Sequence, residues 1–395
     1  MVYRFPNNPS GRLNLRDFVV FAEHRSGWAY CIAAIGALHN DRGVLLDDFV
    51  EKRFSWDYEN NLVEGVIPYR EPWVGIFHNP PDMPEWYHAF DSPQQLLERP
   101  AMRESLTHCR GIFVLSEYHK RWLEPRIDAP VESLVHPTQV SNREFSPERF
   151  EQNPERAIIQ VGVWLRSLTR IAELKVDTIR KVWLVPNELA LRYHAMECER
   201  LGLDPDRLRL ESDVEELAWV DDSDYDELLS KNIVFASLFD SSANNLIVEC
   251  IARNTPILVN PLPAVVEYLG EHYPFYFSTM DEASFKAGSI EHIRLAHDYL
   301  KSMDKRRFTG VAYRAAVMAS SIYQSLPLPS GSDEPEGNIP EKFRRPNCSS
   351  VDVMMRHVRE QLRNHSVLRK DPKDFDLSVE DRILEKFRQE WQREN

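Results

Sequence analysis

The residues best suited to chemistry lie in residues 239–252, where small polar side chains give way to an apolar stretch. Ser242, Asn244 and Asn245 come just before a predicted helix over residues 246–252. The first turn of a helix offers unpaired amide hydrogens and a partial positive charge, which suits a phosphate group. The same side chains also suit a plain helix cap, so both roles stay open.

Two acidic residues in this segment are candidates for direct roles. Asp240 follows a predicted strand, and Glu249 interrupts an otherwise apolar helix. Glu249 could accept hydrogen bonds from a ribose, or it could lie on the outer face of the helix. Asp240 could act on a substrate, or it could be a loop residue that binds neighbouring amides.

The elements that would position these residues form two blocks in which short apolar strands alternate with helices. In the first block we predict strands over residues 18–21, 73–77 and 111–115, and helices over residues 29–38 and 120–123. In the second block we predict strands over residues 157–162, 181–185, 214–220, 233–237 and 256–259, and helices over residues 188–201, 246–252 and 263–269. Ser223 is the predicted N-cap of a further helix. Such alternation is typical of parallel sheets covered by helices on both faces.

A polar, proline-punctuated stretch over residues 140–154 separates the two blocks and is typical of a linker. We therefore expect an α/β protein with two Rossmann-like, doubly wound domains that face a cleft, residues 1–150 and 151–325. Residues 326–395 are predicted to form a loop followed by C-terminal helices. The apolar faces of these helices would pack back on the first domain or form a homodimer contact.

Composition excludes several classes of protein. The formal net charge of −14 argues against a nucleic-acid-binding protein, which needs an excess of Lys and Arg. We expect no transmembrane segment, because no stretch reaches about 18 apolar residues. The five cysteines are scattered and lack CxxC spacing, which favours reduced thiols in a cytoplasmic protein over disulfides or a zinc site. The sequence also lacks the GxSxG, HExxH and Walker motifs.

Residues 237–259 and 263–270 resemble the core motif of family-four glycosyltransferases of the GT-B fold. In that family an acidic residue in a strand-end loop precedes a helix, and a glutamate on the helix contacts the ribose of the sugar nucleotide. Glu249 matches this ribose-binding position. The family's first acidic residue falls on Ser241, eight residues earlier, and Asp240 is the nearest acid that can take its place. Small polar residues replace the family's glycine-rich turn.

Other parts of the chain extend the resemblance. Arg166 and Arg170 follow Gly162, similar to a family element whose basic side chains hold the diphosphate. A guanidinium can grip two phosphate oxygens at once, although a solvated helix face is the alternative for Arg170. In the first block, Gly27 lies where the family carries a glycine loop over the sugar phosphates. His78 resembles a histidine of the family that faces the cleft. The alternative is that His78 is a structural residue in a turn.

The resemblance implies a retaining glycosyltransferase that moves a sugar from a nucleotide-sugar donor to a glycan or other hydroxyl acceptor. It implies no metal ion and no further cofactor. The alternative is a catalytically silent GT-B protein that binds a nucleotide sugar or glycan, or scaffolds a partner. The serine at position 241 and the missing glycines motivate that alternative. A sugar-nucleotide epimerase ranks below both, because the paired glycine motif of such enzymes is absent.

Overall fold

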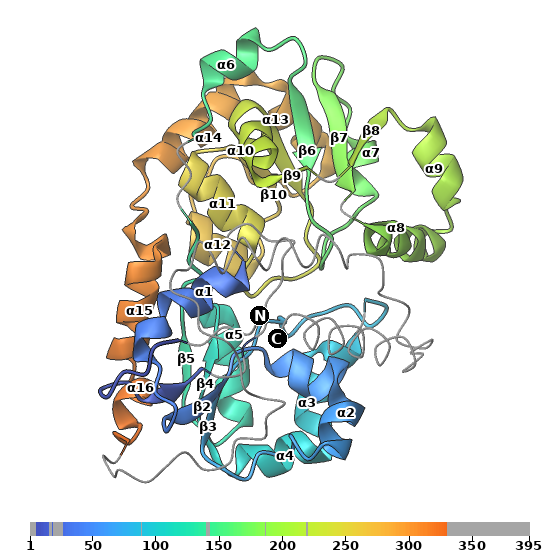
Figure 1. The fold of residues 1–395 in the computed structure, drawn as a ribbon. Helices are drawn as coiled ribbons and strands as arrows, with labels where there is room; N and C mark the ends of the chain where they lie inside the picture. Colours follow the sequence, from blue (N-terminus) through green and yellow to red (C-terminus); the bar gives the residue numbers. More distant parts are fainter. Residues whose placement is uncertain are drawn as a thin grey trace, which may run out of the picture.

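The computed structural model describes residues 5–15, 18, 27–87, 89–139, 143–185, 187–218 and 220–329. These residues form two α/β domains, which lie one above the other in Figure 1. Each domain is built on a five-stranded sheet in which every pairing is parallel. The predicted class, α/β with two Rossmann-like domains, is therefore confirmed.

The first sheet has its strands in sequence order. They are β1 (Leu13–Asn14), β2 (Val44–Asp47), β3 (Trp73–Ile76), β4 (Cys109–Val114) and β5 (Val131–Ser133). The predicted strands over residues 73–77 and 111–115 correspond to β3 and β4. The strand predicted over residues 18–21 lies outside the described residues except for Phe18. The sequence did not indicate strands β1, β2 and β5.

Helices cover both faces of the first sheet. They are α1 (Trp28–Ala34), α2 (Tyr58–Val63), α3 (Pro93–Glu98), α4 (Pro100–Leu106) and α5 (Glu117–Leu123), with a π-helix over Lys52–Trp56. Alternate side chains of β4 enter different cores. Ile112 and Val114 pack with Trp73 on one face, whereas Phe113 packs with Trp28 on the other. This two-sided burial explains why β4 is apolar along its whole second half.

The second sheet differs from the first in strand order. Its strands are β6 (Ala157–Gln160), β7 (Arg180–Val185), β8 (Val214–Ala218), β9 (Ile233–Ala236) and β10 (Ile257–Val259), in the spatial order β10-β9-β6-β7-β8. The chain winds outward in one direction from β6 to β8 and in the other from β9 to β10. The order thus reverses between β6 and β9, and open α/β sheets bind ligands at such a point. Among the described residues, only the second sheet shows this reversal.

The helices of the second domain follow the predicted alternation. They are α6 (Pro147–Gln152), α7 (Arg170–Glu173), α8 (Glu188–Leu201), α9 (Pro205–Glu211), α10 (Asp222–Lys231), α11 (Asn245–Arg253), α12 (Pro263–Leu269), α13 (Met280–Gly288) and α14 (Ile290–Ser302). The prediction of Ser223 as an N-cap was wrong. Asp221 caps α10, because its carboxylate reaches the backbone amides of both Ser223 and Asp224. The linker predicted over residues 140–154 contains α6.

The chain returns to the first domain after α14. Helices α15 (Gly310–Ala319) and α16 (Ser321–Ser325) run down beside α1 in Figure 1. Tyr313 and Ile322 join the same core as Trp28, and the Arg12 guanidinium donates to the carbonyl of Leu326 at 2.9 Å. Both ends of the described chain therefore build the first domain. The helices predicted within residues 351–395, and any dimer contact through them, lie outside the described residues.

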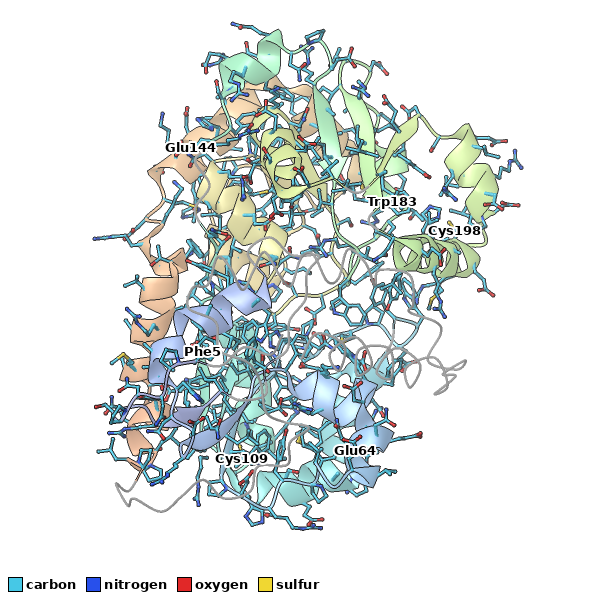
Figure 2. The ribbon with its side chains drawn as sticks, viewed as in Figure 1. Phe5, Glu64, Cys109, Glu144, Trp183 and Cys198 are labelled. Carbon is cyan, nitrogen blue, oxygen red and sulfur yellow. The ribbon has the colours of Figure 1, made fainter. Side chains whose placement is uncertain are left out.

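The described residues contain no helix that is both long enough and apolar enough to cross a membrane. Their cysteines are free thiols. Figure 2 shows Cys109 in the first domain and Cys198 in the second, with the side chains that fill the space around both sheets.

Candidate functional site

The loops after β6 and β9 meet at the point where the strand order of the second sheet reverses. The amide of Ser167 donates to the carbonyl of Ser237 at 2.8 Å, and the amide of Phe239 donates to the carbonyl of Leu165 at 2.9 Å. These backbone bonds hold the two loops together like a short pair of strands. They bring Arg166 next to the beginning of α11.

Arg166 is a half-buried cation that donates hydrogen bonds to neutral oxygen atoms. Its guanidinium donates to the side-chain oxygen of Asn244 and to the carbonyl of Trp164, each at 3.0 Å. Its Nε atom is buried and has no hydrogen-bond partner among the described residues. Burial lowers the pKa of Arg166, whereas Tyr87, Tyr225 and Glu249 act to raise it. A half-buried guanidinium with an unused donor can bind an anionic ligand.

A glycine makes room for this guanidinium. Gly162 has a φ of +79°, and a Cβ atom placed there would lie 2.8 Å from Cζ of Arg166. A side chain at this position would therefore both strain the backbone and push Arg166 aside. The Gly162 and Arg166 pair that the sequence suggested is thus a direct packing contact.

Glu249 lies inside the second domain and not on the outer face of α11. The residue is 4% exposed, and its Oε2 atom accepts a hydrogen bond of 2.8 Å from the Tyr225 hydroxyl of α10. One helical turn later, Arg253 is fully buried and forms an ion pair of 2.6 Å with Asp226 of α10. Two consecutive residues of α10 therefore hold two residues of α11 that are four positions apart.

The polar residues before α11 divide between two roles. Asn244 is the N-cap, because its side-chain oxygen accepts from the amide of Leu246 at 3.1 Å. The side-chain oxygen of Asn245 is buried and has no hydrogen-bond partner among the described residues. Ser242 instead faces the first domain, where its hydroxyl lies 3.0 Å from Nδ1 of His119. Four residues described above lie around the beginning of α11, and we call them the donor cluster: Arg166, Tyr225, Asn244 and Glu249.

Asp240 also faces the first domain. Its Oδ2 atom accepts from the backbone amide of Asp82 at 2.7 Å and lies 3.3 Å from the Tyr118 hydroxyl. Burial raises the pKa of Asp240 to about 6, while the amides of Ser241 and Asp82 act to lower it. Both carboxylate oxygens of Asp240 therefore accept hydrogen bonds from the protein itself. In this arrangement the side chain is not open to a sugar.

A second carboxylate ties the domains together beside Asp240. Glu267 of α12 accepts from the backbone amides of Glu117 and Tyr118 at 2.7 and 2.6 Å. These amides are the first two of α5, so the carboxylate also meets the positive end of that helix. We call these contacts between the two domains the domain joint. The second domain contributes Asp240, Ser242 and Glu267, and the first domain contributes Asp82, Tyr118 and His119.

His78 is held rigidly at the end of β3. Its ring stacks on Phe49 at 3.9 Å between centroids and meets Trp28 edge-on at 4.1 Å. Its Nε2 atom donates to the carbonyl of Asp48 at 2.9 Å. Burial lowers the pKa of His78 to about 3, so the ring is neutral at physiological pH. The backbone amide of His78 donates to Glu51, a fully buried carboxyl whose pKa burial raises to about 8.

Gly27 and Arg170, two further predicted site residues, also lie outside the donor cluster. Gly27 is the N-cap of α1 in the first domain, where its carbonyl accepts from the amide of Tyr30. Arg170 is exposed at the start of α7, and no hydrogen bond or ion pair of it is found among the described residues. The sequence did not indicate Tyr225, Glu267 or Glu51, because no motif identifies a residue whose partner is distant in the chain.

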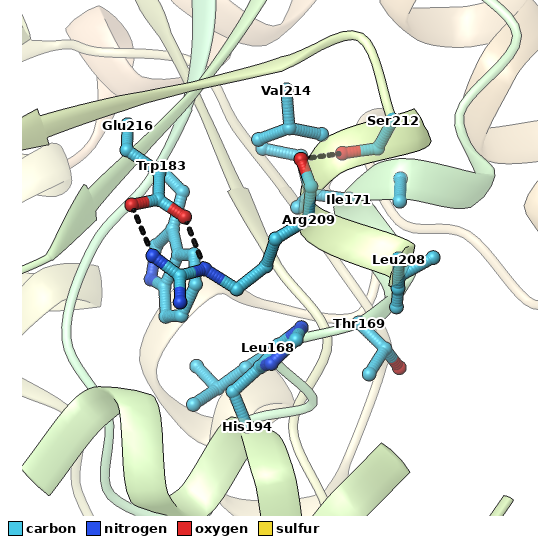
Figure 3. A pocket seen from close by; sticks show the side chains of 11 residues that line it. Leu168, Thr169, Ile171, Trp183, His194, Leu208, Arg209, Ser212, Val214 and Glu216 are labelled. Atoms are coloured by element: carbon cyan, nitrogen blue, oxygen red, sulfur yellow. Dashed lines mark hydrogen bonds and ion pairs between the residues drawn. The ribbon is translucent and has the colours of Figure 1, made fainter. Parts of the chain in front are cut away.

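A small hollow in the second domain lies apart from the donor cluster. Figure 3 shows it between β7, β8 and α9, where Arg209 pairs with Glu216 beside Trp183 and His194. Its volume of about 20 Å³ suits a single water molecule. It shares no residue with the donor cluster. Among the described residues, no group of three or more metal-ligating side chains is assembled.

Comparisons with known proteins agree on the fold. No protein-family model matches the sequence, and no curated protein matches it. Sucrose-phosphate synthase from Thermosynechococcus elongatus has a similar structure, with 9% identity and a TM-score of 0.51 over 69% of this chain and 71% of that chain. HepE from Anabaena in complex with UDP-glucose has 15% identity and a TM-score of 0.53 over 75% of this chain and 95% of that chain. The same protein with UDP and glucose has 12% identity and a TM-score of 0.55, over 78% of this chain and 98% of that chain. The two sheets and this similarity show that the chain has the GT-B fold of glycosyltransferases.

Proposed function

We propose that the protein is a retaining glycosyltransferase, similar to family four, that moves a sugar from a nucleotide-sugar donor to a hydroxyl of a glycan or small molecule. The donor cluster is the observation that carries the proposal. It places a half-buried guanidinium, a helix N-terminus and a buried carboxylate together at the reversal of the second sheet. Such a combination matches the diphosphate and the ribose of one ligand.

Each part of the donor would meet a group of suitable charge. The departing nucleoside diphosphate gains negative charge in the transition state, and fixed positive groups stabilise that state most. Arg166 and the first amides of α11 would supply this charge in place of a metal ion. Glu249 would accept hydrogen bonds from the ribose. A neutral His78 at the end of β3 would orient the sugar or acceptor hydroxyl, and Asp240 would contact the sugar once the domain joint opens.

Nucleotide binding gives the first test. We expect UDP, GDP or ADP to raise the melting temperature of the protein, because a ligand at 100 times its Kd adds about 2.7 kcal/mol to stability. Arg166→Met should weaken binding of the diphosphate far more than binding of the free nucleoside. Arg170→Met is the matched control, since that exposed side chain should leave both affinities unchanged. Failure of every nucleotide to bind would refute the proposal.

Turnover then separates the enzyme from a silent protein of the same fold. The silent alternative is favoured by Ser241, which stands where the family has an acid. It is also favoured by Asp240, whose Oδ2 atom accepts from Asp82 in the domain joint and whose Oδ1 atom accepts from the amide of Ser241. A panel of UDP-, GDP- and ADP-sugars would be tested for nucleotide release. Nucleotide release with one of the donors supports the enzyme. The anomeric configuration of the product, determined by NMR, then tests whether the transfer retains the configuration of the donor sugar. Tight binding without release by any donor supports the silent protein.

A further inference from the structure

Tyr225 contacts the one carboxylate of the donor cluster. Its hydroxyl reaches from α10 to Oε2 of Glu249 at 2.8 Å. The phenol is partly buried, and both burial and Glu249 raise its pKa above the ordinary value. The hydroxyl therefore keeps its proton at neutral pH and acts as a donor toward Glu249.

The helix that carries Tyr225 has little freedom to move relative to α11. The next residue, Asp226, accepts from both Nε and Nη2 of Arg253, at 3.1 and 2.6 Å. Nη1 of Arg253 donates to the carbonyl of Glu249 at 3.1 Å. Breaking this arrangement would leave a charge in the interior without its partner, which is costly. The ion pair thus fixes the register in which Tyr225 and Glu249 meet.

Arg166 gives Glu249 a competing partner. It lies close enough for Glu249 and Tyr225 both to raise its pKa, and its Nε atom has no hydrogen-bond partner among the described residues. A carboxylate beside an available guanidinium tends to form a direct ion pair. The donor from Tyr225 occupies one of about four acceptor positions of the carboxylate and limits its rotation toward Arg166.

We propose that Tyr225 is a positioning residue that holds the Glu249 carboxylate toward the ribose hydroxyls of the bound nucleotide. This inference rests on the proposed function, because it assumes that a ribose lies against Glu249. A ribose presents two neighbouring hydroxyl groups, and a carboxylate whose orientation is set by a fixed donor can meet both of them in one geometry. Tyr225 would thus contribute to the discrimination between nucleotides with and without these hydroxyls, without touching the nucleotide itself.

The test compares a nucleoside diphosphate with its 2′,3′-dideoxy counterpart by isothermal titration calorimetry. UDP, GDP or ADP is chosen as the one that binds the wild type best. The ratio of the two affinities measures the contribution of the ribose hydroxyls. Tyr225→Phe removes one oxygen atom, and we expect it to lower this ratio about three- to tenfold while the affinity for the dideoxy nucleotide stays the same. Tyr276→Phe is the matched control, because its hydroxyl donates to the distant carbonyl of Gly270.

The outcomes distinguish this inference from the proposed function. If the wild type binds none of these nucleotides, the proposed function fails and the inference fails with it. If Tyr225→Phe weakens both nucleotides equally, Tyr225 is merely structural, and the inference alone is overturned. An unchanged ratio overturns it as well.

A second variant covers the case in which Tyr225→Phe does not fold. Glu249→Gln keeps the shape of the side chain but loses its charge, and it should lower the affinity ratio with the melting temperature nearly unchanged. In the double variant, Tyr225→Phe should add no further loss of the ratio, because it acts through Glu249. Additive losses would overturn the inference.

Discussion

Two parts of one short segment, only a few residues apart, have different partners. Asp240 and Ser242 contact the first domain, whereas Asn244 and Glu249 contact side chains of the second. The first part belongs to the domain joint and the second to the donor cluster. The difference shows that neighbouring residues of similar type can have different partners, and we propose that one part holds the domains together while the other binds a ligand. Substitutions in the two parts should therefore have different consequences.

The largest effect should come from the ion pair that fixes α11. Arg253→Met removes the cation that pairs with the buried carboxylate of Asp226, and we expect a loss of about 3–5 kcal/mol in the free energy of unfolding, measured with urea. Arg306→Met is the control, since its pair with Asp304 is exposed and should contribute little to stability. A loss for Arg253→Met as small as that of the control would show that the pair does not fix the donor cluster.

The pH dependence of stability should report on the domain joint. Burial raises the pKa of Asp240 to about 6 from an ordinary value of 3.8, so the folded protein favours the protonated carboxyl. The stabilisation is fully present below pH 3.8 and is lost as the pH rises through about 6. Relative to Asp240→Asn, the wild type should lose up to about 3 kcal/mol over that interval. Urea unfolding of both proteins between pH 3.5 and 7 measures the difference, and parallel curves would contradict the expectation.

A direct comparison of the two acids separates ligand binding from domain closure. Glu249→Ala should cost about 2 kcal/mol of nucleotide binding, or roughly a 30-fold rise in Kd, because the ribose loses a charged acceptor. Asp240→Ala should change the nucleotide Kd less than about threefold and mainly lower turnover. Isothermal titration and nucleotide release measure the two effects. If Glu249→Ala left the affinity unchanged, the assignment of the site would fail.

The sequence alone was sufficient to predict the repeating framework of the second domain. The predicted helices over residues 188–201 and 263–269 match α8 and α12, because long apolar periods and flanking prolines and glycines define such elements locally. The positions of Arg166 and Asn244 also followed, since loops after parallel strands share one edge of a sheet. Their direct hydrogen bond could not be predicted, because it depends on how two loops pack.

Contacts between the domains could not be predicted at all. Nothing in the local sequence indicates that Ser242 faces His119, or that Glu267 meets the first amides of α5. The short strands of the first sheet were missed for a related reason. A strand such as β1, with two residues, is held by its neighbour in the sheet and by side chains from α15 and α16, which are about three hundred residues away in the chain.

The smallest expected effect concerns the second carboxylate of the domain joint. Glu267→Gln keeps one acceptor oxygen but loses the other, so one amide of α5 loses its partner, at a cost of about 1 kcal/mol. Hydrogen exchange of the Glu117 and Tyr118 amides should then become about fivefold faster, since local opening costs that much less. The amide of Leu246 in the donor cluster's helix should exchange as in the wild type. Glu271→Gln is the control, an exposed neighbour on the same segment. Faster exchange at Leu246 as well would mean that the joint and the cluster open together, and the distinction between them would not hold.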